Sequence, residues 1–193
     1  EVNMIPATGS RAGLKPGCKI SLRSLLYCLL LPSGNDAAYT IAVHVGRLKT
    51  GRPDLPVDQS LLIFQAMMNQ RASQIGALNS HFVNPDGYQN IEHYSTPYDM
   101  ALIAREAMKN PVFCQVVGTS SYILTDVPGY RLALKNTNEL LFPDSPHYFA
   151  GATGIKTGHT TPAGACLISS ASLPNARLIA VIMHSNDKDL YSD

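Results

Sequence analysis

The segment Gly118-Thr119-Ser120-Ser121-Tyr122-Ile123-Leu124 marks the point at which the sequence changes from helical to strand-like patterning. Before it, apolar residues recur at helical spacing in four stretches, at 21–31, 36–45, 57–75 and 98–108. After it come short strand-like runs at 121–124, 130–134, 164–171 and 177–184, separated by turn residues. A mainly helical part, 1–118, followed by a mainly antiparallel-strand part, 119–193, predicts an α+β fold with the crevice between the two parts as the default site.

The composition is that of a globular chain without a strongly charged partner. Of the 193 residues, 45% are apolar, which is enough for one substantial core. Charged residues make up only 15%, with a net charge of +1, so no basic field marks the chain for nucleic acid or an anionic membrane. The longest apolar run is about seven residues, against the roughly 20 that cross a bilayer, so we expect no transmembrane helix.

Neither the cysteines nor the histidines form a metal-binding pattern. The four cysteines show no C-x-x-C pairing, and the six histidines show no H-E-x-x-H or comparable helical pairing. We therefore expect no metal and no cofactor, and a metallopeptidase is disfavoured. Cys28 and Cys166 lie in apolar runs, which predicts that both are small buried core residues.

Two short polar motifs carry the candidate chemistry. Lys156-Thr157-Gly158 follows the segment 151–155 (GATGI) and is predicted to lie on a strand, where a glycine leaves room for a ligand. Ser33-Gly34-Asn35 lies in the break between the first two predicted helices, and a plain turn in which Asn35 caps the next helix is the alternative interpretation. Taken together, the motifs supply the K-T-G element and the serine and asparagine of the S-D-N element of serine enzymes that attack β-lactams and related peptides.

Acyl transfer from a peptide with a free terminal carboxylate explains why these residue types would occur together. The reaction needs a cation for the carboxylate, hydroxyls that pass a proton, and an amide that fixes the peptide backbone. Lys156 offers the cation, and Ser33 and Thr157 offer the hydroxyls. Asn35 offers the amide.

Beyond the two motifs, several blocks resemble the low-molecular-weight penicillin-binding D-Ala-D-Ala carboxypeptidases. They follow the family order from about residue 9 to residue 184, at 13–17 (GLKPG), 26–38, 81–87 (HFVNPDG), 93–101 (HYSTPYDMA) and 154–160 (GIKTGHT). The resemblance implies a penicillin-recognising serine transpeptidase/β-lactamase-like fold in which both parts form one domain. It also implies a peptidoglycan pentapeptide substrate ending in D-Ala-D-Ala, inhibition by β-lactams that trap the acyl-enzyme, and a place outside the cytoplasmic membrane.

The same resemblance implies roles for the motif residues. Ser33 would take part in proton transfer, and Asn35 would hold the substrate amide. Lys156-Thr157-Gly158 would bind the terminal carboxylate, with Lys156 also a catalytic residue. The backbone N–H of His159 would form one half of the oxyanion hole, where negative charge develops on the attacked carbonyl.

The family's first motif, Ser-x-x-Lys with the nucleophile, has no counterpart before Ser33. Ser185-Asn186-Asp187-Lys188 has the spacing, but it follows Lys-Thr-Gly in a polar stretch, and we interpret it as chance. Because the chain starts at Glu1 without an initiator methionine, three explanations are open: the nucleophile segment is a separate piece, the chain was cut, or a natural form no longer catalyses. We expect one of the first two explanations, and a second polypeptide that carries Ser-x-x-Lys is one form that the separate piece could take. We also expect that this N-terminally incomplete chain does not turn over substrate alone.

Two other functions compete with the carboxypeptidase. A class A β-lactamase would need a glutamate in a dedicated loop, and Glu139-Leu140 is a poor match; the second motif is also Ser-Gly-Asn instead of Ser-Asp-Asn. A non-catalytic module would hold muropeptide in the same crevice without cleaving it. Acylation by penicillin separates an enzyme from such a module.

Overall fold

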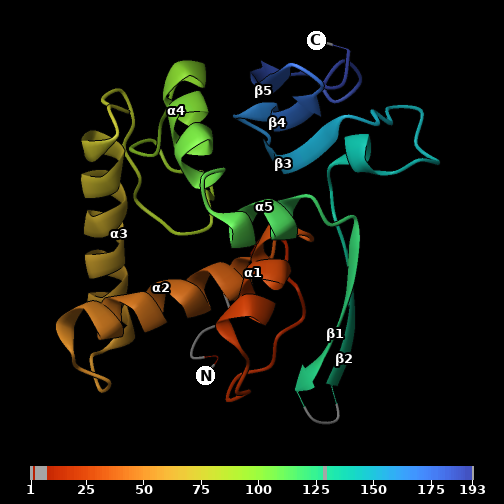
Figure 1. The fold of residues 1–193 in the computed structure, drawn as a ribbon. Coiled ribbons are helices and arrows are strands. Elements are labelled where there is room, and N and C mark those ends of the chain that lie inside the picture. The colour runs from red at the N-terminus through yellow and green to blue at the C-terminus, as the bar shows by residue number, and fades with distance from the viewer. Residues whose placement is uncertain (1, 3–7, 128–129, 193) are drawn as a thin grey trace.

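The computed structural model of the chain describes residue 2, residues 8–127 and residues 130–192 (Figure 1). Within these residues the first part folds into five α-helices: α1 (Leu22–Leu30), α2 (Asn35–Thr50), α3 (Val57–Gln74), α4 (Pro97–Ala107) and α5 (Pro111–Val117). The second part contains strands and a short 3-10 helix: β1 (Ser121–Val127), β2 (Tyr130–Lys135), η1 (Glu139–Leu141), β3 (Ala152–Thr160), β4 (Gly164–Leu173) and β5 (Ala176–Ser185). The predicted order of helices and then antiparallel strands is confirmed.

Helix α5 is a helix that the apolar pattern did not predict. The side-chain oxygen of Asn110 accepts hydrogen bonds from the N–H groups of Val112 (2.9 Å) and Phe113 (3.3 Å), and Pro111 occupies the first turn. Its seven residues are too few for a helical repeat to show in the sequence, so the capping pair was the available signal. The structure gives no candidate membrane span, because no helix among the described residues combines the length and apolar character that crossing requires.

The strands form two separate antiparallel sheets. β1 and β2 pair as a hairpin, whereas β3, β4 and β5 pair in sequence order as a three-stranded sheet. The hairpin extends along the side of the molecule that carries α1, and the three-stranded sheet lies beside α4 (Figure 1). Strands β3 and β5 are therefore the edge strands of their sheet, and β3 carries one of the predicted motifs.

The largest cluster of buried apolar residues lies between α1 and the β1–β2 hairpin. Cys28 and Leu31 at the end of α1 are fully buried and belong to the same cluster as Leu124 of β1. The rings of Tyr27 and Tyr122 stack, with centroids 3.9 Å apart and planes 5° from parallel. This core fixes the end of α1, from which the turn with the first motif departs.

One of the two cysteine predictions is confirmed and the other is wrong. Cys28 is buried, whereas Cys166 is only partly buried. Cys166 lies near the start of β4, where its Sγ approaches the carbonyl oxygen of Ala163 at 3.7 Å in the turn before the strand. Its neighbours Ala165 and Leu167 are buried, and because successive side chains of a strand point to opposite faces, Cys166 lies on the less covered face.

Candidate active site

The Ser33-Gly34-Asn35 motif forms the tight turn between α1 and α2. Ser33 adopts a left-handed backbone conformation (φ 61°), which costs a residue with a Cβ about 1–3 kcal/mol. Gly34 has no space for a side chain, since a Cβ there would lie 2.6 Å from the carbonyl oxygen of Cys28. The surrounding structure therefore holds Ser33 in a strained conformation, as is common where a side chain must point into a site.

Asp36, directly after the motif, holds the turn in place through hydrogen bonds from backbone N–H groups. Its side chain is fully buried, and its two oxygens accept hydrogen bonds from the backbone N–H groups of Ala12, Gly13, Leu14 and Ala37 at 2.9–3.0 Å. A carboxylate that accepts several N–H groups makes strong, charge-assisted bonds. The sequence interpretation did not single out Asp36, and its place inside the 26–38 block was the available signal.

Asn35 is almost buried at the start of α2. It is 7% exposed, and its backbone N–H donates to the carbonyl oxygen of Ser10 at 2.9 Å. Its side-chain amide occupies the space in which a Cβ on Gly9 would fall, so Gly9 is required for this close approach. The segment before α1 thus covers the amide group that the resemblance assigns to substrate binding.

The Lys156-Thr157-Gly158 motif lies in β3, as predicted, on the edge strand of the three-stranded sheet. Lys156 and Thr157 are partly buried, whereas Gly158 and His159 are exposed. A Cβ on Gly158 would meet nothing within 4 Å. The strand is therefore open at this point, in agreement with the expectation that the glycine leaves room for a ligand.

Lys156 is a partly buried cation whose contacts are to neutral groups. Its Nζ donates to the carbonyl oxygen of Thr157 (2.8 Å) and lies 3.4 Å from Oγ1 of Thr137. Among the described residues, no carboxylate lies within ion-pair distance of it. Burial lowers the pKa of this ammonium from 10.5 to about 8, because desolvation disfavours the charged form. An anionic ligand would supply the missing countercharge.

Thr137, between β2 and η1, connects the two motifs. Its Oγ1 lies 2.6 Å from Oγ1 of Thr157, and its backbone N–H donates to the carbonyl oxygen of Leu31 at 3.2 Å. Leu31 precedes Ser33 by two residues, so the strand motif and the turn motif lie on the same side of the molecule with Thr137 between them. The sequence interpretation missed Thr137, since its partners are far away in the chain.

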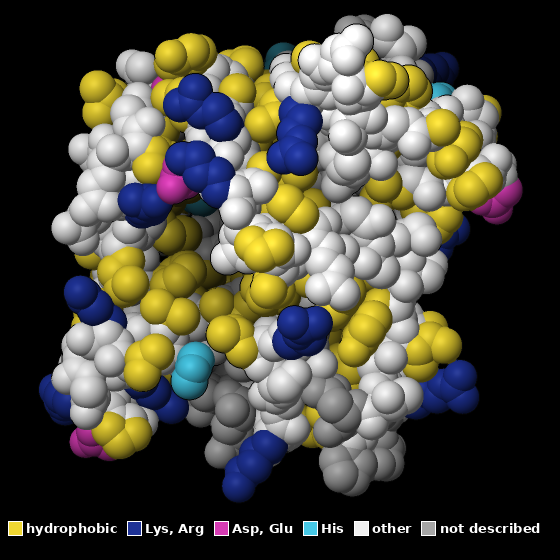
Figure 2. Space-filling model, in the orientation of Figure 1, with side chains coloured by type: hydrophobic (Ala, Val, Ile, Leu, Met, Phe, Trp, Pro, Cys, Tyr) yellow, Lys and Arg dark blue, Asp and Glu magenta, His cyan; other side chains and the backbone are white. Residues whose placement is uncertain are grey.

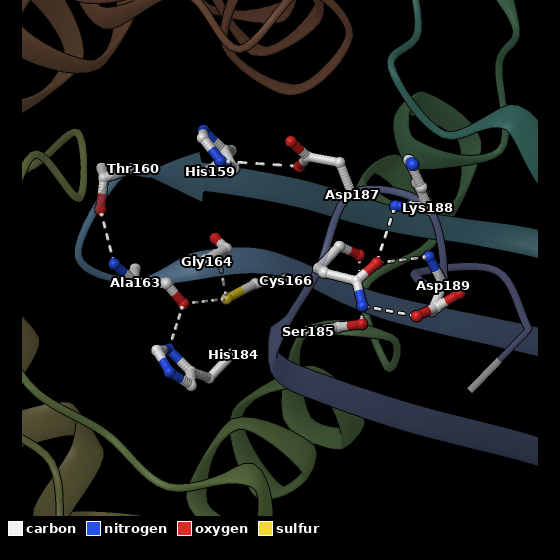
Figure 3. Close-up of polar contacts among 11 residues, drawn as sticks. His159, Thr160, Ala163, Gly164, Cys166, His184, Ser185, Asp187, Lys188 and Asp189 are labelled. Carbon is white, nitrogen blue, oxygen red and sulfur yellow. Dashed lines mark hydrogen bonds and ion pairs between the residues drawn. The ribbon is translucent and has the colours of Figure 1, made fainter.

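The imidazole of His159 points to the segment that follows β5. Its Nε2 lies 3.5 Å from Oδ1 of Asp187, and both side chains are exposed (Figure 3). The role that the resemblance implies for His159 concerns its backbone N–H and requires no contact of the imidazole. The imidazole is engaged by Asp187, so the group of His159 that can face a ligand is its backbone.

The Ser-x-x-Lys spacing at 185–188 begins at the last residue of β5 and continues into the turn that follows it. Oγ of Ser185 donates to the carbonyl oxygen of Asn186 at 3.2 Å, and the side-chain oxygen of Asn186 accepts from the backbone N–H of Lys188 at 3.0 Å (Figure 3). A nucleophile of this class opens a helix, with its lysine one turn later. The turn geometry therefore supports the interpretation of this spacing as chance.

Comparison with known proteins agrees with the geometry. The chain matches the D-alanyl-D-alanine carboxypeptidase family over residues 6–187 and belongs to that family. It is 38% identical over 181 residues to a D-alanyl-D-alanine carboxypeptidase of Streptomyces sp. strain K15, covering 91% of this chain and 58% of the relative. It is 32% identical over 174 residues to the D-alanyl-D-alanine carboxypeptidase DacF of Bacillus subtilis, covering 90% of this chain and 40% of the relative.

Solved structures show the same fold. The crystal structure of the Streptomyces K15 DD-transpeptidase superposes with a TM-score of 0.83 at 34% identity, covering 95% of this chain and 68% of that chain. The predicted penicillin-recognising serine transpeptidase fold is therefore confirmed, and the chain represents about two thirds of it. The chain spans about half the length of the two curated relatives described above.

Proposed function

We propose that this chain supplies the substrate-binding part of a serine-type D-Ala-D-Ala carboxypeptidase that removes the terminal D-Ala of peptidoglycan pentapeptides. The observation that carries the proposal is Lys156, a partly buried ammonium on an open edge strand, for which the described residues provide no carboxylate partner. A terminal carboxylate is the ligand that would complete this site, since a buried cation is stabilised by a hydrogen-bonded anion. Membership of the carboxypeptidase family supports the same ligand.

The proposed roles follow the arrangement of the two motifs. Lys156 and Thr157 bind the terminal carboxylate, and Gly158 leaves space beside them. Asn35 holds the peptide backbone from the opposite side of the crevice, which requires the segment at Gly9 to move off its amide. The hydroxyl of Ser33 passes a proton to the departing D-Ala. The backbone N–H of His159 donates to the oxygen of the attacked carbonyl as charge develops there.

The nucleophile in this proposal comes from a segment outside the given sequence, either continuous with this chain or on a second polypeptide. The sequence has no Ser-x-x-Lys before Ser33. An apolar hollow of about 730 Å³ between α4 and the β4–β5 face, lined by residues that include Leu102, Met108 and Ile179, offers a surface that a further helix could cover. Figure 2 shows hydrophobic side chains gathered across the middle of one face of the molecule. The chain alone then binds substrate without turning it over.

The complete enzyme would act outside the cytoplasm, because its peptidoglycan substrate is located there. The proposed site also predicts β-lactams as inhibitors, since they carry a carboxylate beside a reactive carbonyl. Both parts of the chain, 1–118 and 119–193, would work as one transpeptidase-like domain with the crevice between them.

Peptide binding tests the carboxylate site directly. We expect the chain to bind diacetyl-L-Lys-D-Ala-D-Ala at least about tenfold more tightly than the same peptide with a C-terminal amide, since one charge-assisted contact is worth about 1.5 kcal/mol or more. Lys156→Met should remove this preference, whereas Lys109→Met, at an exposed position paired with Glu106, should keep it. Equal binding of the acid and the amide by the unaltered chain would contradict the proposal.

Intact mass after incubation with penicillin tests the origin of the nucleophile. We expect no adduct on the 193-residue chain alone, and an adduct on the serine of Ser-x-x-Lys once the complementary segment is present. An adduct on the chain alone would show that the nucleophile lies within this sequence. Peptide binding without any adduct in the complete assembly would favour a non-catalytic muropeptide-binding module.

A further inference from the structure

The long loop between α3 and α4 touches the end of β3 through two side chains. Oγ1 of Thr160 donates to Oε1 of Gln89 at 2.9 Å, a contact between residues 71 positions apart in the sequence. Thr160 is the last residue of β3 and lies two residues beyond Gly158. Gln89 is exposed, so the contact crosses the surface at the end of the strand that carries the candidate site.

The turn that presents Thr160 is itself held by further contacts (Figure 3). The backbone N–H of Ala163 donates to Oγ1 of Thr160 at 3.2 Å, and Nδ1 of His184 lies 3.2 Å from the carbonyl oxygen of Ala163. His184 has a left-handed backbone (φ 60°) where the pairing of β4 with β5 shifts register. Such a bulge redirects a side chain, and here it directs the imidazole to the turn.

The direction of a bound peptide along β3 rests on the proposed function. If Lys156 and Thr157 hold the terminal carboxylate and the N–H of His159 holds the attacked carbonyl, the peptide runs along β3 from 156 to 159. The residues on the amino side of the attacked bond then continue in the direction of Thr160. The contact between Thr160 and Gln89 lies at that end of the crevice.

We propose that Gln89 and Thr160 form a strap across this end of the crevice, which the residue before D-Ala-D-Ala must displace in order to bind. The hydroxyl of Thr160 already donates to Gln89 and accepts from Ala163, so a passing peptide finds no free partner there while the strap is closed. A hydrogen bond between exposed side chains adds little net stability, so the strap opens for a longer peptide at a small cost in affinity. Gln89 is thus a specificity-determining residue.

Two peptides binding to the full 193-residue chain test the strap. One is N-acetyl-D-Ala-D-Ala, which ends before Thr160, and the other is diacetyl-L-Lys-D-Ala-D-Ala, which extends past it. In Gln89→Ala we expect the affinity for the longer peptide to rise about threefold to tenfold relative to the shorter, as for the loss of one exposed hydrogen bond. Thr160→Val should shift the ratio in the same direction, because it opens the strap from the other side.

Gln70→Ala, at an exposed position on α3, serves as the matched control and should leave both affinities unchanged. If the unaltered chain binds both peptides and neither strap variant changes their ratio, the strap is wrong and the proposed function stands. If the unaltered chain binds neither peptide, the proposed function fails, and the strap fails with it. A ratio that changes equally in Gln70→Ala would also overturn the strap, since the effect would not depend on this contact.

Discussion

The α1–α2 turn and strand β3 face the same crevice but are held in different ways. The turn is fixed from inside, where Asp36 is fully buried with its oxygens bonded to backbone N–H groups, and Gly34 has no space around it. Strand β3 is open instead, since Gly158 has empty space beside it and Lys156 contacts neutral groups alone within the described part of the chain. One side of the site is preformed, and the other is left for a ligand to complete.

Because of this difference, substitutions in the turn and in the strand should affect different properties of the protein. Changes in the turn should alter the free energy of unfolding, because its groups are desolvated and fully bonded. Changes in the strand should alter ligand affinity and leave the fold intact, because its groups are partly exposed. The following substitutions test this separation.

Asp36→Ala should have the largest effect on stability. The substitution removes the acceptor of four backbone N–H groups, of which those of Leu14 and Ala37 are buried. Each buried group left without a partner costs about 1–3 kcal/mol, so we expect a loss of about 3 kcal/mol or more in the free energy of unfolding. Denaturation in urea measures it. Asp54→Ala is the control, because Asp54 is 79% exposed and 3.9 Å from Arg52, and it should change stability by less than about 0.5 kcal/mol. Similar losses in both variants would contradict a buried anchor.

Replacing a glycine by alanine in each motif tests whether the turn is closely packed and the strand is open. In Gly34→Ala the new Cβ meets the carbonyl oxygen of Cys28 at 2.6 Å, and such overpacking should lower stability by about 1–3 kcal/mol. In Gly158→Ala the Cβ meets nothing, so stability should change by less than about 0.5 kcal/mol while peptide affinity falls. Urea midpoints and peptide titrations measure the two effects. An equal loss of stability in both variants would show that β3 is not open.

The charge of Lys156 should make peptide affinity depend on pH. Because burial lowers its pKa to about 8, the ammonium is charged below that pH, and affinity for a peptide carboxylate should fall up to about tenfold per pH unit above it. The effect of Lys156 on the free energy of unfolding changes with pH in the opposite direction. Between pH 8 and 10.5 the unfolded chain binds more protons, so the cost of burying this ammonium decreases and the stability of the fold rises with pH.

Peptide titrations from pH 6 to pH 10 measure the affinity, and Lys156→Met should flatten the profile. Urea midpoints over the same range measure the opposite trend in stability. A pH-independent affinity in the unaltered chain would show that the charge of Lys156 does not hold the ligand.

Most helices and strands could be predicted from the sequence because their patterns are long and local. The expected helix at 57–75 is observed as Val57–Gln74, and the expected strand at 177–184 is observed as Ala176–Ser185. The expected helix at 36–45 is longer in the structure and ends at Thr50, before Gly51 in a left-handed conformation. Helix α5 was missed because seven residues are too few to show a helical repeat.

The parts that could not be predicted depend on contacts between distant residues. Asp36 accepts from N–H groups 22–24 positions earlier, and Thr137 reaches Thr157 20 positions later. No local pattern marks either side chain. The motif residues were found through the resemblance, but the division into two sheets was not, because strand patterns do not specify which strands pair. Their catalytic roles stay predictions.

The stacked pair of Tyr27 and Tyr122 gives the protein a built-in reporter. The sequence contains no tryptophan, so tyrosine emission is not hidden behind indole fluorescence. The two rings come from α1 and β1, and they separate only when the hairpin leaves the helix. The ring-current shifts of these two side chains therefore report the docking of the hairpin without any label, whereas tyrosine fluorescence sums over all nine tyrosines of the chain.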